Sequence, residues 1–215
     1  LQGAYALASD PALLDRVPAG SVLLVTPVHL TSSDLGTTSS PLRLGPDIGL
    51  TRRGKDLVTA LEARRILVDL AHVGRRGFWD AVSVHDPTRP LIVSHTGLAG
   101  VRDHWRNLDD AQLRAVAASG GTVGVIYHCG FLRGGPLQAR ALDVALHLEH
   151  IVATVGEDHA SLGSDWDGCI VTPRDLATAS ELPRLTATLL GRGHSPERIQ
   201  KILGGNVLRV IGALR

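Results

Sequence analysis

The chain has 215 residues, of which 44% are hydrophobic and 20% are charged, which is an ordinary balance for a globular protein. Its length is sufficient for one sizeable hydrophobic core. A formal net charge of +1 argues against a basic nucleic-acid surface and against an acidic tail. The most apolar stretches, residues 22–25 and 91–93, are too short to span a membrane.

The sequence contains no methionine and two cysteines, Cys129 and Cys169. Because no secretory signal stands at the start, a cytoplasmic location is favoured. We also expect the natural beginning of the chain to have been removed or to lie upstream of Leu1. Two cysteines do not make a disulfide framework, and a single disulfide is neither required nor excluded.

The elements expected from the sequence alternate between short β-branched runs and helical patterns, with a long loop rich in Ser, Thr, Gly and Pro. In chain order they are strand 22–26, loop 31–49, helix 53–63, strand 66–70, helix 76–83, strand 91–94, helix 109–118, strand 122–127, helix 137–155, strand 161–163 and helices 181–190, 196–203 and 206–214.

This alternation of strands and helices is typical of parallel βαβ units. Most of the strand segments are continuous apolar runs, as expected for strands buried on both faces. Two architectures share the pattern, an open doubly wound sheet and a closed TIM (β/α)8 barrel. The residues at the strand ends favour the barrel, so we predict an α/β fold with one domain over residues 1–215.

A histidine or an aspartate follows each of the five predicted strands: His29, His72, His95, His128 and Asp165. In a TIM barrel the C-terminal strand ends converge on one rim, where active sites lie. Imidazole and carboxylate groups are a common ligand set for zinc. A lone histidine after a strand is more often a loop or core residue, but five such residues on consecutive strands favour a shared site.

These five residues are not equivalent. His72, His95 and Asp165 are the candidates for the shared site, whereas His29 is better suited to contact a substrate than to bind a metal. His128 is left open between a site residue and a loop residue, because the two residues after it suggest a plain loop. Surface or capping positions are expected for the other histidines, which are His85, His104, His147, His150, His159 and His194.

Two more polar residues near the strand ends leave alternatives open. Arg106 lies in the loop after the third predicted strand. Its guanidinium group can clamp a carboxylate with two hydrogen bonds, or it can pair on the surface with Asp103 or Asp109. Asp167, two residues after Asp165, can cap its loop through its side chain.

Seven segments in this order and spacing resemble the membrane dipeptidase (renal dipeptidase) family, peptidase family M19, whose members are similar to other TIM-barrel amidohydrolases. The resemblance covers essentially the whole chain, although each segment is weak alone. The segments are VDLAHV (68–73), SHT (94–96), HWRN (104–107), GGTVGV (120–125), HLEHI (147–151), LGSDWDG (162–168) and GGNVLRV (204–210).

The resemblance implies a metal-dependent hydrolase that holds two zinc ions at the barrel rim and cleaves dipeptides. It implies His72 and His95 as ligands of one zinc. It implies His29 and Arg106 as substrate contacts, with Arg106 on the carboxylate of the dipeptide. Asp165 is then the carboxylate that acts on the nucleophilic water, which zinc converts to hydroxide near neutral pH.

The sequence departs from the family pattern at two points. The family has a His-X-Asp pair at its first strand that binds the other zinc, and this sequence has no such pair. We therefore expect the first strands of the barrel to lie outside it. The family also has a glutamate that bridges the two zinc ions, and the matching position here is Gln2, whose neutral amide is a poor substitute for a bridging carboxylate.

Three interpretations of Gln2 stay open: a site with a single zinc, a non-catalytic dipeptidase-like binding protein with a degenerate metal site, and an active enzyme with a divergent residue. A different amidohydrolase reaction, on a lactone or a phosphoester, is a further alternative. The expected partners are a small dipeptide and a second copy of the chain in a homodimer. No nucleic acid and no transmembrane segment are expected.

Overall fold

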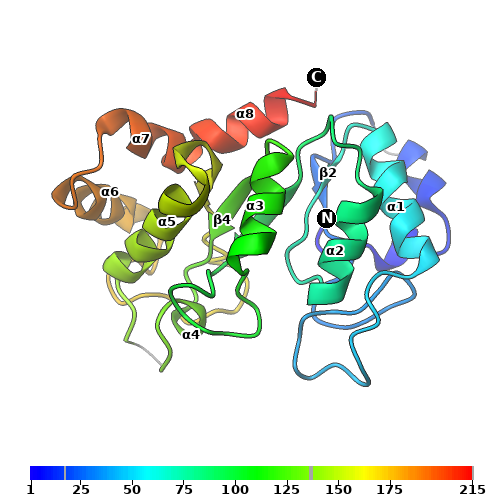
Figure 1. Ribbon diagram of the computed structural model, residues 1–215, viewed down its shortest axis with the longest axis horizontal. Helices are drawn as coiled ribbons and strands as arrows, with labels where there is room; N and C mark the ends of the chain where they lie inside the picture. Colours follow the sequence, from blue (N-terminus) through cyan, green and yellow to red (C-terminus); the bar gives the residue numbers. More distant parts are fainter. Residues whose placement is uncertain (17, 136–137, 215) are drawn as a thin grey trace. The chain divides into compact units, whose positions relative to one another are not determined.

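The computed structural model describes residues 1–16, 18–135 and 138–214 (Figure 1). The described chain divides into two compact units, and each is considered by itself. The first combines residues 1–92 with the C-terminal segment from Val210, and the second runs from Val93 to Arg209. The prediction of a single domain over residues 1–215 stays a prediction.

The first unit alternates helices with short strands. Its elements in chain order are η1 (Tyr5–Leu7), η2 (Pro11–Arg16), β1 (Leu24–Val25), α1 (Arg52–Ala63), β2 (Leu67–Val68) and α2 (Arg75–Val84). Strands β1 and β2 pair in parallel. Two isolated parallel bridges, Gln2 with Thr26 and Asp69 with Ile92, add a segment on each side of this pair. Parallel pairing of strands that are separated by helices agrees with the predicted βαβ pattern.

A small apolar core holds this unit together. Leu67 and Ile92 are almost completely buried, and they cluster with Val210 and Leu214 of the C-terminal segment. Helix α1 begins at its N-cap Thr51, whose side-chain oxygen accepts a hydrogen bond from the backbone N–H of Gly54. A cap of this kind satisfies one of the free N–H groups at the start of a helix.

The second unit contains a three-stranded sheet in the order β3-β4-β5, and β4 and β5 pair in parallel. Helices α3 and α5 pack against β4. The elements in chain order are β3 (Ile92–Thr96), α3 (Asp110–Ala118), β4 (Thr122–Val125), α4 (Cys129–Leu132), α5 (Ala141–Val155), η3 (Glu157–His159), β5 (Ala160–Leu162), η4 (Ala179–Glu181), α6 (Leu182–Gly191), α7 (Pro196–Gln200), η5 (Lys201–Gly205) and α8 (Asn206–Gly212), with β3 and α8 crossing the boundaries of the unit.

All five predicted strands are confirmed, and so are the seven predicted helices, with shifts at their ends. The predicted helix 137–155 begins at Ala141, and its expected first residue lies outside the described part of the chain. The predicted helix 196–203 is α helical only to Gln200. It continues as the wider turn η5, in which Gly204 leaves helical geometry with φ 175°.

The expectation of a plain loop after His128 is wrong, because a short helix, α4, begins at Cys129. Nδ1 of His128 accepts a hydrogen bond from the backbone N–H of Gly130, 3.0 Å away, and so caps this helix. In the described ranges, no helix combines the length and the apolar character needed to cross a membrane.

Candidate active site

The turn after β2 positions His72. Asp69 is 1% exposed. Its Oδ2 accepts a hydrogen bond from Oγ1 of Thr26 at 2.9 Å, and its Oδ1 accepts one from the backbone N–H of Ala71 at 3.0 Å. An aspartate that binds the backbone two residues ahead folds the chain into a tight turn. His72 is the next residue and has a left-handed backbone, with φ 64°.

Gln2 and His29 both contact the imidazole of His72. Nε2 of the Gln2 amide lies 3.0 Å from Nε2 of His72. The rings of His29 and His72 meet edge to face, with centroids 4.5 Å apart. Oγ1 of Thr38 lies 2.6 Å from the carbonyl oxygen of His29 and 3.3 Å from that of His72. The first unit therefore brings three residues of the predicted site together.

In the second unit, His95 lies within β3 rather than beyond its end, and its residue is 7% exposed. Oγ of Ser94 lies 2.8 Å from Nδ1 of His95. Nη2 of Arg106 donates a hydrogen bond of 3.1 Å to the carbonyl oxygen of His95. Arg106 is only 5% exposed, so the surface alternative for this arginine is wrong.

Asp165 lies three residues beyond β5, at the same end of the sheet that His95 approaches along β3. It is half-buried and has a left-handed backbone with φ 58°. Its carboxylate lies over Gly168, where a Cβ atom would collide with it. Burial lowers the pKa of His128, and the negative charge of Asp165 raises it by a smaller amount. Asp167 is exposed.

The described residues include four non-glycine positions with a left-handed backbone: Arg65, His72, Asp165 and Cys169. Such a conformation costs an L-residue roughly 1–2 kcal/mol. Residues of this kind are concentrated at functional sites, where the surrounding structure holds them in place. Two of the four are residues that the sequence marks as site candidates, and each follows a parallel strand.

The predicted site residues thus form two groups, Gln2 with His29 and His72 in the first unit, and Arg106 with His95 in the second unit, which also holds Asp165. Neither unit, over the ranges described, gathers three His, Cys, Asp or Glu side chains into a group that could hold a metal ion.

The expectation of surface or capping roles for the other histidines is wrong for His147 and His194. His85 is the C-cap of α2, and its ring pairs with the carboxylate of Glu62, with both side chains largely buried. His147 is completely buried, and its Nδ1 accepts a hydrogen bond of 2.9 Å from the backbone N–H of Leu98. His194 is 8% exposed. The buried histidine on α5 lies three or four positions from apolar residues on both sides, and this spacing was the signal in the sequence.

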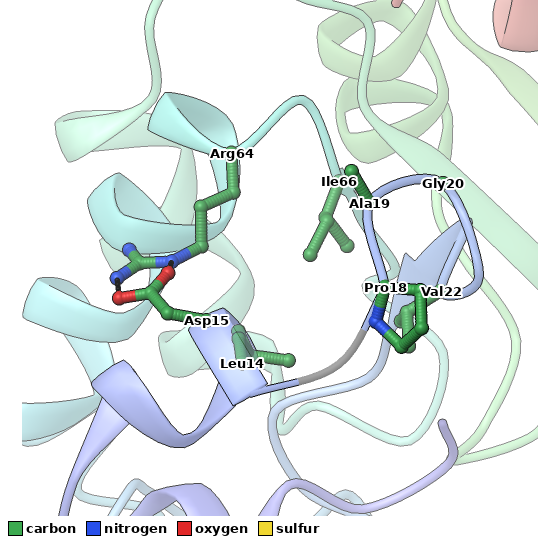
Figure 2. Close-up of a pocket in the computed structure, with 8 residues that line it drawn as sticks. All are labelled: Leu14, Asp15, Pro18, Ala19, Gly20, Val22, Arg64 and Ile66. Carbon is green, nitrogen blue, oxygen red and sulfur yellow. Dashed lines mark hydrogen bonds and ion pairs between the residues drawn. The ribbon is translucent and has the colours of Figure 1, made fainter.

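A cavity of about 330 Å³ lies elsewhere in the first unit (Figure 2). It is lined mainly by apolar side chains, those of Leu14, Pro18, Ala19, Val22 and Ile66. An ion pair between Asp15 and Arg64, with N–O distances of 2.6 and 2.8 Å, borders it. Since Val22 and Ile66 precede β1 and β2, whereas His72 follows β2, the cavity is at the opposite strand ends from His72.

The chain is similar along its whole length to a known family. The family described as Membrane dipeptidase (Peptidase family M19) matches residues 1–215. An uncharacterized protein of Klebsiella pneumoniae, named for its place in the pqqA 5′ region, is 37% identical over 166 residues, which are 76% of this chain and 60% of that protein. An uncharacterized dipeptidase of Schizosaccharomyces pombe is 32% identical over 213 residues, which are 98% of this chain and 51% of that protein.

Two solved structures superpose over almost all of the chain. A metallopeptidase from Rhodobacter sphaeroides, liganded with a phosphinate mimic of the dipeptide L-Ala-D-Ala, is 28% identical with a TM-score of 0.88; the match covers 100% of this chain and 62% of that one. The dipeptidase AC, a metallopeptidase of the same family, is 30% identical with a TM-score of 0.87, over 99% of this chain and 63% of that one.

These matches confirm the predicted fold class, an α/β fold of the TIM-barrel type. The chain spans about half to two thirds of the length of the relatives it matches. The match over residues 1–215 and the structural agreement lead to one conclusion, that the chain belongs to the membrane dipeptidase family, peptidase family M19.

Proposed function

We propose that the protein hydrolyses dipeptides with the help of zinc bound at the C-terminal strand ends. Membership of the dipeptidase family supports this proposal, as does the dipeptide mimic bound to the similar metallopeptidase. The observation in this chain that carries it is the left-handed backbone of His72 and Asp165, each placed just beyond a parallel strand.

Two of the predicted site residues carry donor groups that suit zinc. We propose His72 and His95 as zinc ligands, because imidazole nitrogen is a preferred zinc ligand. The contact between Ser94 and Nδ1 of His95 is of the kind that orients a ligating imidazole from its other nitrogen. Gln2 fits less well, since a neutral amide supplies no charge to offset a dication. When bound, zinc supplies a Lewis acid that lowers the pKa of water and polarises a carbonyl group.

The side chains of the protein then have distinct tasks. The carboxylate of Asp165 accepts a proton from the attacking water and returns it to the leaving amine as the peptide C–N bond breaks. The guanidinium group of Arg106 attracts the carboxylate of the dipeptide, and its burial strengthens that attraction by excluding solvent. His29 contacts the substrate beside His72, with which its ring packs.

A comparison of two histidine variants tests the proposal. In the zinc-loaded protein, His95→Ala should lower the rate of L-Ala-D-Ala hydrolysis at least about 100-fold, because it removes a metal ligand. The matched control is His159→Ala, since His159 lies before β5, at the strand end opposite to Asp165. Release of free amino acids is the readout. Unchanged zinc-dependent hydrolysis in the His95 variant would refute the proposal.

A second candidate function is a dipeptide-binding protein without catalysis. Gln2 favours it, because its amide lies against the imidazole that we propose as a zinc ligand. Calorimetric binding of L-Ala-D-Ala by a protein that retains no zinc and releases no amino acids would support this second function over the first. Assembly into a homodimer stays a prediction, which sedimentation velocity tests directly.

A further inference from the structure

Four aromatic side chains of the second unit stack on one another: His104, Trp105, His128 and Phe131. We call this cluster the aromatic shelf. The ring centroid of His104 lies 4.9 Å from that of Trp105 and 4.4 Å from that of Phe131. The rings of His128 and Phe131 are stacked, with centroids 4.8 Å apart and an interplanar angle of 22°. Two of the rings come from the loop after β3, and the other two come from the start of α4, which lies beside that loop (Figure 1).

Hydrogen bonds to the backbone around the shelf hold it in place. Asn107 is 9% exposed, and its Nδ2 donates to the carbonyl oxygens of Phe131 at 2.9 Å and of Arg102 at 2.8 Å. Nδ1 of His104 accepts a hydrogen bond of 3.3 Å from the backbone N–H of Arg106. The loop after β3 and helix α4 are therefore tied together, so the shelf is organised before any ligand arrives.

The shelf presents an uncharged surface to solvent. Trp105 is 51% exposed although it rests on other rings. Burial is the main cause that lowers the pKa of His104, and positive neighbours lower it further. Burial is also the main cause that lowers the pKa of His128. The lowered pKa values favour the neutral form of both imidazoles, and an uncharged aromatic surface can stack with an aromatic or apolar partner.

The shelf borders the carboxylate that we assign to the reaction. His128 and Asp165 each lie three residues beyond the paired residues Val125 and Leu162 of β4 and β5. The backbone N–H of Tyr127 donates a hydrogen bond of 3.3 Å to the carbonyl oxygen of Ser164, so the two segments run together past the end of the sheet. Trp105 is the neighbour in sequence of Arg106, which we assign to the dipeptide carboxylate. Single exposed apolar residues are common on protein surfaces and need no explanation. Here an exposed tryptophan packs against two rings, those of His104 and Phe131, near a candidate catalytic group, and that combination points to a ligand.

We infer that the aromatic shelf receives an aromatic side chain of the dipeptide, so that the protein selects dipeptides that contain an aromatic residue. The inference rests on the proposed function and goes beyond it by naming the substrate class. A large aromatic side chain stacked on Trp105 would bury apolar surface that an alanine side chain leaves exposed.

The test compares substrates in the zinc-loaded protein. The values of kcat/KM are measured for L-Ala-L-Phe, L-Phe-L-Ala and L-Ala-L-Ala. We expect at least one of the two phenylalanine dipeptides to be preferred over L-Ala-L-Ala by about tenfold. Trp105→Ala should lower kcat/KM for the preferred phenylalanine dipeptide about tenfold relative to that for L-Ala-L-Ala, which removes the preference, and Trp105→Phe should restore most of it.

The control is Trp79→Ala, because Trp79 is 38% exposed and lies on α2 in the first unit. It should keep the preference of the unchanged protein. Thermal unfolding of each variant shows that it is folded. Hydrolysis with the same preference in the Trp105→Ala variant would overturn the inference and leave the proposed function standing.

If the protein does not hydrolyse these dipeptides, its affinity for each of the three is measured by calorimetry. If no dipeptide is cleaved but Trp105→Ala abolishes tighter binding of the phenylalanine dipeptides, the inference holds for a binding protein and the proposed catalysis fails. If none of the three dipeptides is bound or cleaved, both are overturned.

Discussion

The amide of Gln2 lies 3.0 Å from Nε2 of His72. An amide –NH2 group only donates hydrogen bonds, so the imidazole nitrogen is the acceptor in this arrangement. A metal ion bound at Nε2 would use the same lone pair of electrons. The side chain at position 2 therefore competes with a metal ion for Nε2 of His72, and the affinity for zinc measures this competition.

The substitution Gln2→Glu should raise the affinity for zinc by about 10- to 100-fold. A carboxylate in this position would supply a negative charge to offset the dication and would no longer donate to His72. Zinc per chain is measured by elemental mass spectrometry after loading and desalting, and the affinity by competition with a chelator. The control is Gln200→Glu at the exposed end of α7, which adds the same charge elsewhere. Equal zinc affinity in both variants would contradict the competition between the amide and the metal.

Asp69 should be important for stability as well as for the position of His72. Its buried carboxylate accepts hydrogen bonds from Thr26 and from the backbone of Ala71. Asp69→Ala leaves these donors without their acceptor, and we expect the free energy of unfolding to fall by about 2–3 kcal/mol. Thr26→Val removes one donor and keeps the shape, so its effect should be smaller, about 1 kcal/mol. Urea unfolding measures both, and equal losses would show that the carboxylate is not the centre of this network.

Much of the fold was predictable because the strands are continuous apolar runs between helical patterns. The features of the fold that the sequence did not predict depend on a few individual contacts. Helix α4 was missed because it is short and because its N-cap is His128, which is not one of the usual capping residues. Strands β1 and β2 are each only two residues long, and the residues that follow them, Thr26 and Asp69, form isolated parallel bridges with Gln2 and Ile92 instead.

The polar residues that follow the strands could also be predicted, because parallel strands end on one side of a sheet. The backbone conformation of those residues could not be predicted. Nothing in the sequence indicates the left-handed backbone of His72 or Asp165. Glycine is the usual residue in this conformation, and neither position has a glycine. The burial of Arg106 was equally hidden, since its hydrogen bond to the backbone carbonyl oxygen of His95 leaves no pattern in the sequence.

Gly168 should be required for the position of the Asp165 carboxylate. A Cβ atom at position 168 would collide with that carboxylate, so Gly168→Ala should displace it. We expect kcat for dipeptide hydrolysis to fall about tenfold or more, because a displacement near 1 Å is costly for a catalytic group. The control is Gly191→Ala at the end of α6, where a Cβ atom meets nothing within 4 Å. A normal rate in the Gly168 variant would indicate that the carboxylate does not act in the reaction.

His147 should make the stability of the protein depend on pH. Burial is the main cause that lowers the pKa of this histidine in the folded state, so the unfolded state binds a proton more readily. The stabilisation is complete above the unfolded pKa of about 6.5 and declines as the pH falls below it. For one such group the slope reaches at most about 1.4 kcal/mol per pH unit.

Urea unfolding at pH 5.5 and 7.5 measures this dependence, with His147→Gln as the comparison. A glutamine offers an oxygen to the backbone N–H of Leu98 and an N–H to the carbonyl oxygen of Leu132, the two groups that the imidazole contacts. It does not titrate, so the loss of stability between the two pH values should become smaller in this variant. If the variant and the unchanged protein lose the same free energy of unfolding, the buried histidine does not cause the dependence. A smaller loss would show that the buried histidine causes the dependence. Both of its ring nitrogens already contact backbone groups, so they are not available to a metal ion, and the strand-end histidines remain the candidates.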